Sequence, residues 1–372
     1  MKGLKIIATL CFVLLFGAQS YSAEAPAIRD AKDSAERSRV QSLLDGAMKE
    51  NALDWIANMI EPQQADYIIA GFKEYYGLPR LKHTYAYGVS TEVIGRVDQI
   101  LKAGRTPPDI TWMPAWDWYT DLIKQGRAMR YDSPYHKEYT LSNESGNSKP
   151  GYWVSDFNPP FPLWNVKALE KRGIKNFNPA SWWDFIDPKF NEAICLSNSS
   201  VSNAAISWVI GLRKVLADDW FIKFGKLKPA LWTKTQQGET WVASGEYPIA
   251  LQMRPKQAQR FAESGVEVRA LWPKEGVVLA PYSPIILAAA PHPNTAKLFI
   301  DYVRSLPGTN RMAESGAGLL YGRPGVKYSE KDKKFIPPAE NIKAINVDWE
   351  KDTSTENLKA AREWAKKVGV GY

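Results

Sequence analysis

Apolar residues recur along this chain in two alternating patterns, one typical of helices and the other typical of strands. Spacings of three and four residues predict helices over 62–76 and 90–104, and a shorter helix that ends at Gly126. The stretch 81–87 alternates as a strand does, and 108–112 is predicted as a short strand. Because strands and helices alternate, we expect a largely parallel sheet with helices on both faces.

The same order of elements begins again in the middle of the chain. Ser181 precedes a short apolar helix, and 193–196 has the composition of a buried strand. A helix is predicted over 201–216, and 246–251 is predicted as another strand. The two α/β units are separated by a loop-rich stretch, 143–162, so the chain is predicted to form two lobes.

The N-terminus has the pattern of a secretory signal peptide. Lys2 and Lys5 precede an apolar run over 6–16, which small and polar residues follow. The run is shorter than the ~20 residues that a membrane-spanning helix needs. We therefore expect residues 1–23 to be removed by cleavage near residues 20–23, and the mature protein to be exported to the periplasm.

Composition and charge narrow the range of functions. The chain has 372 residues, of which 45% are hydrophobic and 24% are charged, which is typical of a globular protein with about two domains. The net charge of +8 is spread along the chain without a basic stripe, so nucleic acid is not an expected partner. The three histidines lack metal-ligand spacing, so a histidine zinc site is not expected.

Four stretches of the second half together resemble a known family. They are NPASWWDFIDPKFNEAICLS (178–197), VASGEYPIAL (242–251), GVVLAPYSPIILAAAPHPNTAKLFIDYVRS (276–305) and GLLYGRPGV (318–326). In order and spacing they resemble the periplasmic solute-binding proteins of ABC importers, in the branch that includes the ferric-iron, thiamine and phosphonate binders. The resemblance extends from about residue 47 to residue 326.

This resemblance implies a two-lobed α/β fold of the type 2 periplasmic binding proteins, with a mostly parallel sheet in each lobe and crossover strands between them. The expected divisions are the signal peptide (1–23), the first part of lobe 1 (24–160), lobe 2 (161–280), and the return into lobe 1 with the C-terminal helices (281–372). We expect the final helix, around residues 358–365, to pack on the first lobe.

The resemblance also implies how such a protein works. A small-molecule ligand binds in the cleft, the hinge closes around it, and the protein, expected to be a monomer, delivers it to a membrane permease. Neither enzymatic activity nor a resident cofactor or metal is expected.

Eight residues are candidates for contact with the ligand, because they fall at the expected cleft edge or on the returning strand. They are Ser90, Thr91, Trp112, Trp116, Ser199, Ser200, Arg254 and Tyr282. The two pairs of hydroxyl residues precede helices, whose N-termini favour anions, although each pair is equally consistent with simple helix capping. An arginine offers two parallel hydrogen bonds to a carboxylate or phosphate, and tryptophans offer apolar faces. Arg323 is a weaker second candidate for anion binding.

The ligand is expected to be a small organic anion: a phosphonate, a phosphate ester or a carboxylate. The iron-binding members of the family carry a tyrosine pair where this chain has Pro255 and Lys256, and a further tyrosine where it has Trp164. These side chains offer no anionic oxygen to Fe³⁺. Ferric iron in another ligand shell, a thiamine-like cation stacked on tryptophan, a secreted hydrolase and a receptor for a sensor kinase remain alternatives.

Overall fold

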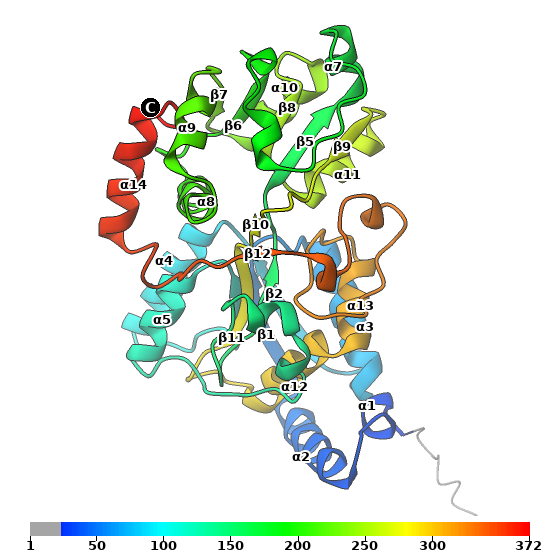
Figure 1. Cartoon of the computed structure of the whole chain (residues 1–372). Coiled ribbons are helices and arrows are strands. Elements are labelled where there is room, and N and C mark those ends of the chain that lie inside the picture. The colour runs from blue at the N-terminus through cyan, green and yellow to red at the C-terminus, as the bar shows by residue number, and fades with distance from the viewer. Residues whose placement is uncertain (1–23) are drawn as a thin grey trace, which may run out of the picture.

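The computed structural model describes residues 24–372, so the predicted signal peptide lies outside the described residues. Two five-stranded sheets, each flanked by helices, form two lobes, which lie one above the other in Figure 1. A short pair of strands lies between them. None of the helices in the described part of the chain has the length and apolar character needed to cross a membrane.

The first lobe contains the sheet with strand order β2-β1-β3-β11-β4. Its strands are β1 (Ala52–Ala57), β2 (Lys82–Tyr87), β3 (Ile110–Met113), β4 (Asp156–Phe157) and β11 (Pro281–Ile286). Its helices are α1 (Pro26–Arg29), α2 (Ser34–Glu50), α3 (Pro62–Tyr76), α4 (Ser90–Lys102), α5 (Trp116–Lys124), α6 (Thr140–Glu144), α12 (Pro293–Arg304) and α13 (Leu306–Glu314), with a 3₁₀ helix at His136–Glu138.

The second lobe contains the sheet with strand order β7-β6-β8-β5-β9. Its strands are β5 (Phe161–Asn165), β6 (Ile194–Ser197), β7 (Ala230–Trp232), β8 (Ile249–Met253) and β9 (Val268–Ala270). Its helices are α7 (Val166–Lys171), α8 (Asn203–Arg213), α9 (Asp218–Gly225), α10 (Thr235–Ser244) and α11 (Pro255–Glu263), with 3₁₀ helices at Trp182–Phe185 and Pro188–Phe190.

The predicted two-lobed α/β fold is confirmed, with one refinement of the strand directions. Within each sheet, three strands pair in parallel: β1, β2 and β3 in the first lobe, and β6, β7 and β8 in the second. The remaining pairings are antiparallel and involve β11 and β4 in one lobe and β5 and β9 in the other. All four of these strands flank the crossings between the lobes.

The hinge consists of chain segments that run between the two sheets. One crossing joins β4 to β5, and another runs from β9 to β11. The second crossing contains β10 (Val277–Val278), which pairs in parallel with β12 (Ala344–Ile345) from near the C-terminus. The two crossings also touch each other, because the backbone N–H of Asn158 donates to the carbonyl of Ala280 at 3.4 Å.

The C-terminal helix lies on the second lobe, so the expectation that it packs on the first lobe was wrong. Short 3₁₀ helices at Asp332–Lys334 and Ala339–Asn341 precede it. Helix α14 (Thr355–Lys367) packs along α8, at the left of Figure 1. Its Trp364 ring lies 5.2 Å from that of Phe221 and 3.8 Å below the Arg213 guanidinium. Its apolar stripe indicates one buried face, but the second lobe supplies the partner.

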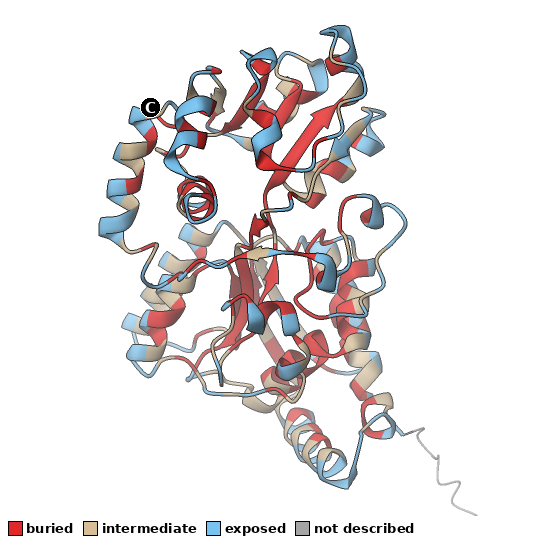
Figure 2. Cartoon of the chain, viewed as in Figure 1, coloured by how far each residue is buried: buried red, intermediate tan, exposed pale blue. Residues whose placement is uncertain are grey.

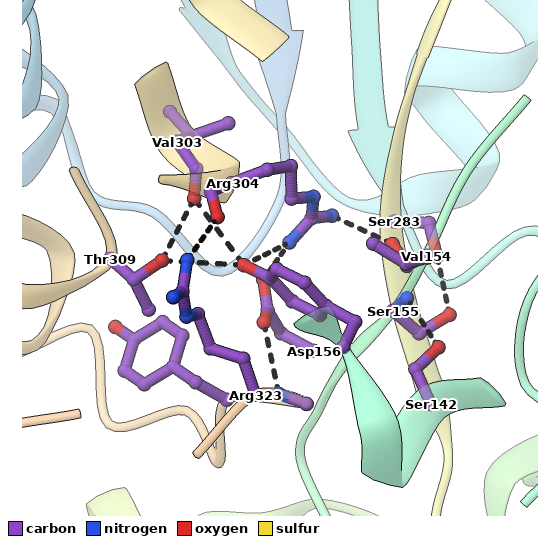
Figure 3. A network of polar contacts seen from close by, with 12 residues as sticks. Ser142, Val154, Ser155, Asp156, Ser283, Val303, Arg304, Thr309 and Arg323 are labelled. Carbon is purple, nitrogen blue, oxygen red and sulfur yellow. Dashed lines mark hydrogen bonds and ion pairs between the residues drawn. The ribbon is translucent and has the colours of Figure 1, made fainter. Parts of the chain in front are cut away.

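Burial follows the two sheets: their inner strands and the facing helix surfaces are largely red in Figure 2, whereas the edge strands β2 and β9 contain no buried residue. A buried polar network also ties α12 to the hinge side of the first lobe (Figure 3). In it, Arg304 pairs with Asp156, and both side chains are fully buried. Arg323 donates to the carbonyl of Arg304 at 2.7 Å and pairs with Glu138 at 2.6 Å. Arg323 is therefore used inside the fold and does not line the cavity described below.

Candidate functional site

A cavity of about 430 Å³ lies between the two lobes and is called the interlobe cavity here. The first lobe supplies part of its lining: Ser90, Thr91, Ile94, Pro114, Ala115, Trp116, Asp117 and Trp118. The second lobe supplies Asn203, Ala204, Ser207, Trp208 and Arg254. The hinge crossings and the C-terminal segment supply Pro160, Val278, Ala280, Pro281, Trp349, Thr353 and Leu358. A hollow of about 560 Å³ beside α10 and α11 is lined by the second lobe alone.

The cavity lies where strands end and helices begin. Pro114 directly follows β3, and Arg254 directly follows β8. The first residues of α4 and of α8 both belong to the lining, one helix from each lobe. Figure 1 shows α8 of the upper lobe facing α4 and α5 of the lower lobe, with α14 beside them. Ligands of α/β proteins commonly bind at this edge of a sheet.

The cavity brings together four of the eight predicted residues: Ser90, Thr91, Trp116 and Arg254. The hydroxyl of Ser90 does not cap α4, because Val89 occupies the N-cap position. It accepts a hydrogen bond from the Asn58 side chain at 2.7 Å instead. Ser90 is thus fixed by a neighbouring loop, and the backbone N–H groups of the first turn of α4 receive no side-chain cap.

Trp112 and Tyr282 lie in the core of the first lobe and do not line the cavity. They are on the neighbouring strands β3 and β11, and their rings stack with centroids 5.7 Å apart. The Tyr282 hydroxyl donates to the carbonyl of Asn58 at 2.9 Å. Tyr282 therefore helps to position the loop that holds Ser90, while Trp112 contributes packing.

Ser199 and Ser200 do not line the cavity either, and the C-terminal tail explains why. The Ser199 hydroxyl is buried and donates to the carbonyl of Val370 at 2.6 Å. Gly371 lies against both serine side chains. Helix α8 begins two residues later than predicted because Ser202 caps it, accepting from the N–H of Ala205 at 3.2 Å.

Arg254 is the cationic side chain of the cavity lining and has no carboxylate partner within residues 24–372. Its Nε atom is buried without a hydrogen-bond acceptor. Burial lowers the pKa of the guanidinium below its usual value, with no acidic group to offset the effect. The residue as a whole is half-buried, so the guanidinium is partly desolvated without a partner. Such a group is typical of a site that an anion completes.

The other unpaired polar atoms of the lining are also hydrogen-bond donors. The indole N–H groups of Trp116 and Trp208 are buried without acceptors. The other two tryptophans of the lining are paired: Trp118 donates to Asp98 at 2.9 Å, and Trp349 donates to Asn147 at 2.6 Å. The buried unpaired atoms in the lining are therefore three N–H donors, which a ligand rich in acceptors would satisfy.

The lining does not fit a ferric ion. Asp117 is its one carboxylate, and no tyrosine or histidine belongs to the lining. Fe³⁺ prefers several anionic oxygen ligands. A separate group of three possible metal ligands, Asp54, Asp109 and His292, lies within the first lobe. There, Asp109 is buried and accepts hydrogen bonds from the backbone of Asp54 and from both the backbone and the ring of His292, at 2.7 to 2.9 Å.

The sequence analysis missed several residues of the lining. Trp208 and Leu358 lie on predicted helices, but their apolar character could not be distinguished from that of core positions. Trp349 comes from a C-terminal stretch without a regular pattern. Asp117 was visible in the aromatic loop after β3. Burial and the nearby carboxylates of Asp121 and Glu350 raise the pKa of Asp117 above its usual value.

Comparisons with known proteins give the family and the fold of the chain. A family model for bacterial extracellular solute-binding proteins matches residues 107–351. None of the curated proteins matches the chain.

Several solved structures share the fold. One is the periplasmic binding protein AfuA from Actinobacillus pleuropneumoniae with fructose-6-phosphate bound, at a TM-score of 0.65 and 18% identity over 85% of this chain and 98% of that one. Iron-bound HitA from Pseudomonas aeruginosa aligns with a TM-score of 0.63 and 16% identity over 86% and 99% of the two chains. A putative extracellular solute-binding protein from Bordetella parapertussis aligns with a TM-score of 0.68 and 14% identity over 86% of this chain and 99% of that one.

Proposed function

The chain belongs to the family of bacterial extracellular solute-binding proteins, and from this premise we propose that it captures a small organic anion in the interlobe cavity for an ABC importer. The anion would be a carboxylate, a phosphate ester or a phosphonate. The predicted signal peptide over 1–23 supports a periplasmic location, and a membrane permease is the proposed partner.

The observation that carries the proposal is the unpaired guanidinium of Arg254. A carboxylate or phosphate accepts two parallel hydrogen bonds from such a group and neutralises its charge. The unpaired indole N–H groups of Trp116 and Trp208 offer two further donors. Fructose-6-phosphate, which the AfuA structure contains, is an example of a small organic anion bound by this fold.

Capture would couple ligand binding to closure of the lobes. The two lobes and the hinge each supply part of the lining, so a ligand can contact all of it only when the lobes are together. The ligand would shift the equilibrium toward the closed form by its extra affinity for that form. The closed form would then be the one that a permease recognises.

Three alternatives are less well supported by the lining. Ferric iron lacks anionic oxygen ligands there, as described above. A thiamine-like cation would find tryptophan faces, but it would also lie beside the unpaired charge of Arg254. A hydrolase would need an activated nucleophile or an acid–base pair, whereas the described part of the lining offers serine and threonine hydroxyls, a single carboxylate and no histidine.

The proposal is tested by calorimetry and thermal unfolding of the mature protein with carboxylates, hexose phosphates and phosphonates. A bound anion at 100 times its Kd should stabilise the protein by about 2.7 kcal/mol. Arg254→Ala should weaken binding at least tenfold, because a hydrogen bond to a charged group contributes about 1.5–3 kcal/mol.

Arg269→Ala is the matched control, because Arg269 is an exposed arginine of the same lobe that does not line the cavity. It should leave affinity unchanged. If every anion still binds Arg254→Ala as tightly as the wild type, the proposal is contradicted. Tighter binding of ferric iron or of an organic cation than of any anion would contradict it as well.

A further inference from the structure

The charges of the interlobe cavity are distributed unevenly between its two sides. On the second-lobe side, Arg254 is the charged side chain, and the first turn of α8 contains no acidic residue. On the first-lobe side, the charged side chain is Asp117, in the first turn of α5. The Glu350 carboxylate is close enough to raise the pKa of Asp117.

This asymmetry gives the ligand an orientation. An anionic group is favoured at the second-lobe side by Arg254, the one cationic side chain that the described residues contribute to the lining. The N-terminal ends of α4 and α8 reach the cavity from both lobes, so the helix dipoles do not distinguish its two sides. The anionic group would be repelled at the first-lobe side by Asp117. A second anionic group at the far end of the ligand would meet that repulsion, so a single anionic group fits the cavity best.

Most of the rest of the lining is apolar, and four of its residues are tryptophans. Trp116 comes from the first lobe and Trp208 from the second, so each lobe brings one indole with an unpaired N–H group to the cavity. Each ring is fixed by an edge-to-face contact with another tryptophan: Trp116 with Trp153 at 5.3 Å, and Trp208 with Trp182 at 5.5 Å. Rings held in this way are pre-organised, and contact with them costs little side-chain entropy.

Aliphatic side chains complete the apolar wall from three different parts of the chain. Ile94 comes from α4, Val278 from the hinge, and Leu358 from α14. The lining has four hydroxyl side chains, Ser90, Thr91, Ser207 and Thr353. Two of them are already used, because Thr353 donates to the carbonyl of Trp349 and Ser90 accepts from Asn58. A polyhydroxylated body such as a sugar would leave many of its own hydroxyls unpaired against this wall.

We infer that the ligand is an aromatic ring system with a single anionic group, which binds Arg254 while the ring lies between Trp116 and Trp208. The inference rests on the proposed function and specifies its ligand class. The anionic group is a carboxylate or a phosphate. A cavity of about 430 Å³ is of the size that holds a small organic molecule of this kind.

Matched pairs of probes test the inference by calorimetry. Benzoate and cyclohexanecarboxylate share their charge and approximate size, but only benzoate is aromatic. Benzoate should bind about tenfold more tightly, because contacts with two aromatic rings each add a small preference. Terephthalate should bind at least threefold more weakly than its monomethyl ester, and Asp117→Asn should reduce that difference. The affinities of phenyl phosphate and glucose 6-phosphate repeat the ring comparison with a phosphate as the anionic group, and phenyl phosphate should bind more tightly.

Two variants locate the ring. Trp116→Leu keeps an apolar wall but removes the indole, so the preference for benzoate over cyclohexanecarboxylate should fall toward one. Trp183→Leu is the control, because Trp183 is 40% exposed and does not line the cavity. It should leave the preference unchanged.

The outcomes separate this inference from the proposed function. If citrate or glucose 6-phosphate binds more tightly than the aromatic probes and Arg254→Ala weakens that binding, the ligand class is wrong and anion capture stands. Equal affinities for benzoate and cyclohexanecarboxylate would also overturn the aromatic assignment. If no probe of either kind binds at 1 mM, both the inference and the proposed function fail.

Discussion

Glu61 of the first lobe and Lys256 of the second form an ion pair, with the carboxylate oxygen and the ammonium nitrogen 2.5 Å apart. Glu61 lies immediately before α3, and Lys256 lies in the first turn of α11. The pair therefore joins the two lobes directly and would be broken when they separate. Its hydrogen bond and charge lower the pKa of Glu61 below its usual value.

Glu61→Gln should make the lobes open more readily. Because both side chains are partly exposed, the effect should be modest: ligand dissociation measured by stopped-flow fluorescence should be up to about fivefold faster. The difference between wild type and variant should shrink in 0.5 M salt. It should also shrink at acidic pH: Lys256 stabilises the charged carboxylate, so the contribution of the pair is lost as the pH falls through the lowered pKa of Glu61.

Asp219→Asn provides the comparison, since Asp219 pairs with Lys223 inside one helix of the second lobe. It should not change the dissociation rate. A Glu61→Gln protein that releases ligand at the wild-type rate in low salt would show that this pair plays no part in closure.

Arg254→Met should separate stability from binding. Without ligand the guanidinium is half-buried and has no acidic partner, so an apolar side chain of similar length should raise the free energy of unfolding by up to about 1 kcal/mol. The same variant should bind an anionic ligand at least tenfold more weakly. Urea denaturation and calorimetry measure the two effects. A variant that is less stable than wild type without ligand would show that Arg254 stabilises the fold.

His136 should make the first lobe sensitive to acid. It is buried, with Nδ1 3.0 Å from a carboxylate oxygen of Asp132. Burial and the nearby Arg304 charge lower its pKa to about 4. In the unfolded chain, this histidine binds a proton at higher pH than it does in the folded protein. Acid therefore favours unfolding: the neutral histidine costs no stability above about pH 6.5, and stability is lost as the pH falls from there toward 4.

The free energy of unfolding should therefore fall by about 2 kcal/mol between pH 7 and pH 5 because of this one group. His136→Gln should lose that part of the pH dependence when urea denaturation is compared at the two pH values. If the free energy of unfolding falls equally between pH 7 and pH 5 in both proteins, other groups cause the pH dependence.

Trp364→Ala should destabilise the second lobe and leave the first unaffected. It removes the contact of α14 with Phe221 and the cation–π contact with Arg213, and it should lower the free energy of unfolding by about 2 kcal/mol. Hydrogen exchange should show faster exchange in α8 and α9. Faster exchange in α3 or α12 instead would contradict the placement of α14 on the second lobe.

The regular elements could be predicted well from the sequence because local patterns determine them. The helix predicted over 62–76 matches α3, since a proline at its start and Gly77 in the left-handed conformation at its end are local signals. Helix α8 begins at Asn203 rather than Val201, because the Ser202 side chain caps it by accepting from the N–H of Ala205.

The partners of these elements could not be predicted in the same way. An apolar stripe on α14 indicates that one face is buried, but it carries no information about which lobe covers that face. The sequence places Arg254 at the end of a strand, yet only the folded chain shows that no carboxylate within residues 24–372 pairs with it. Trp112 and Trp116 belong to one aromatic stretch, but Trp112 lies in β3, which is buried along its whole length, while Trp116 begins α5 and reaches the cavity.

The most direct measurement is native mass spectrometry of the mature protein, isolated from the periplasm without refolding, beside its Arg254→Ala variant prepared in the same way. Capture of an organic anion between the lobes predicts that wild type carries an additional small mass, which fragmentation identifies as an acid, and that the variant lacks it. An additional mass that equals a ferric ion or a cation, or an acid that the variant retains fully, would contradict capture by Arg254.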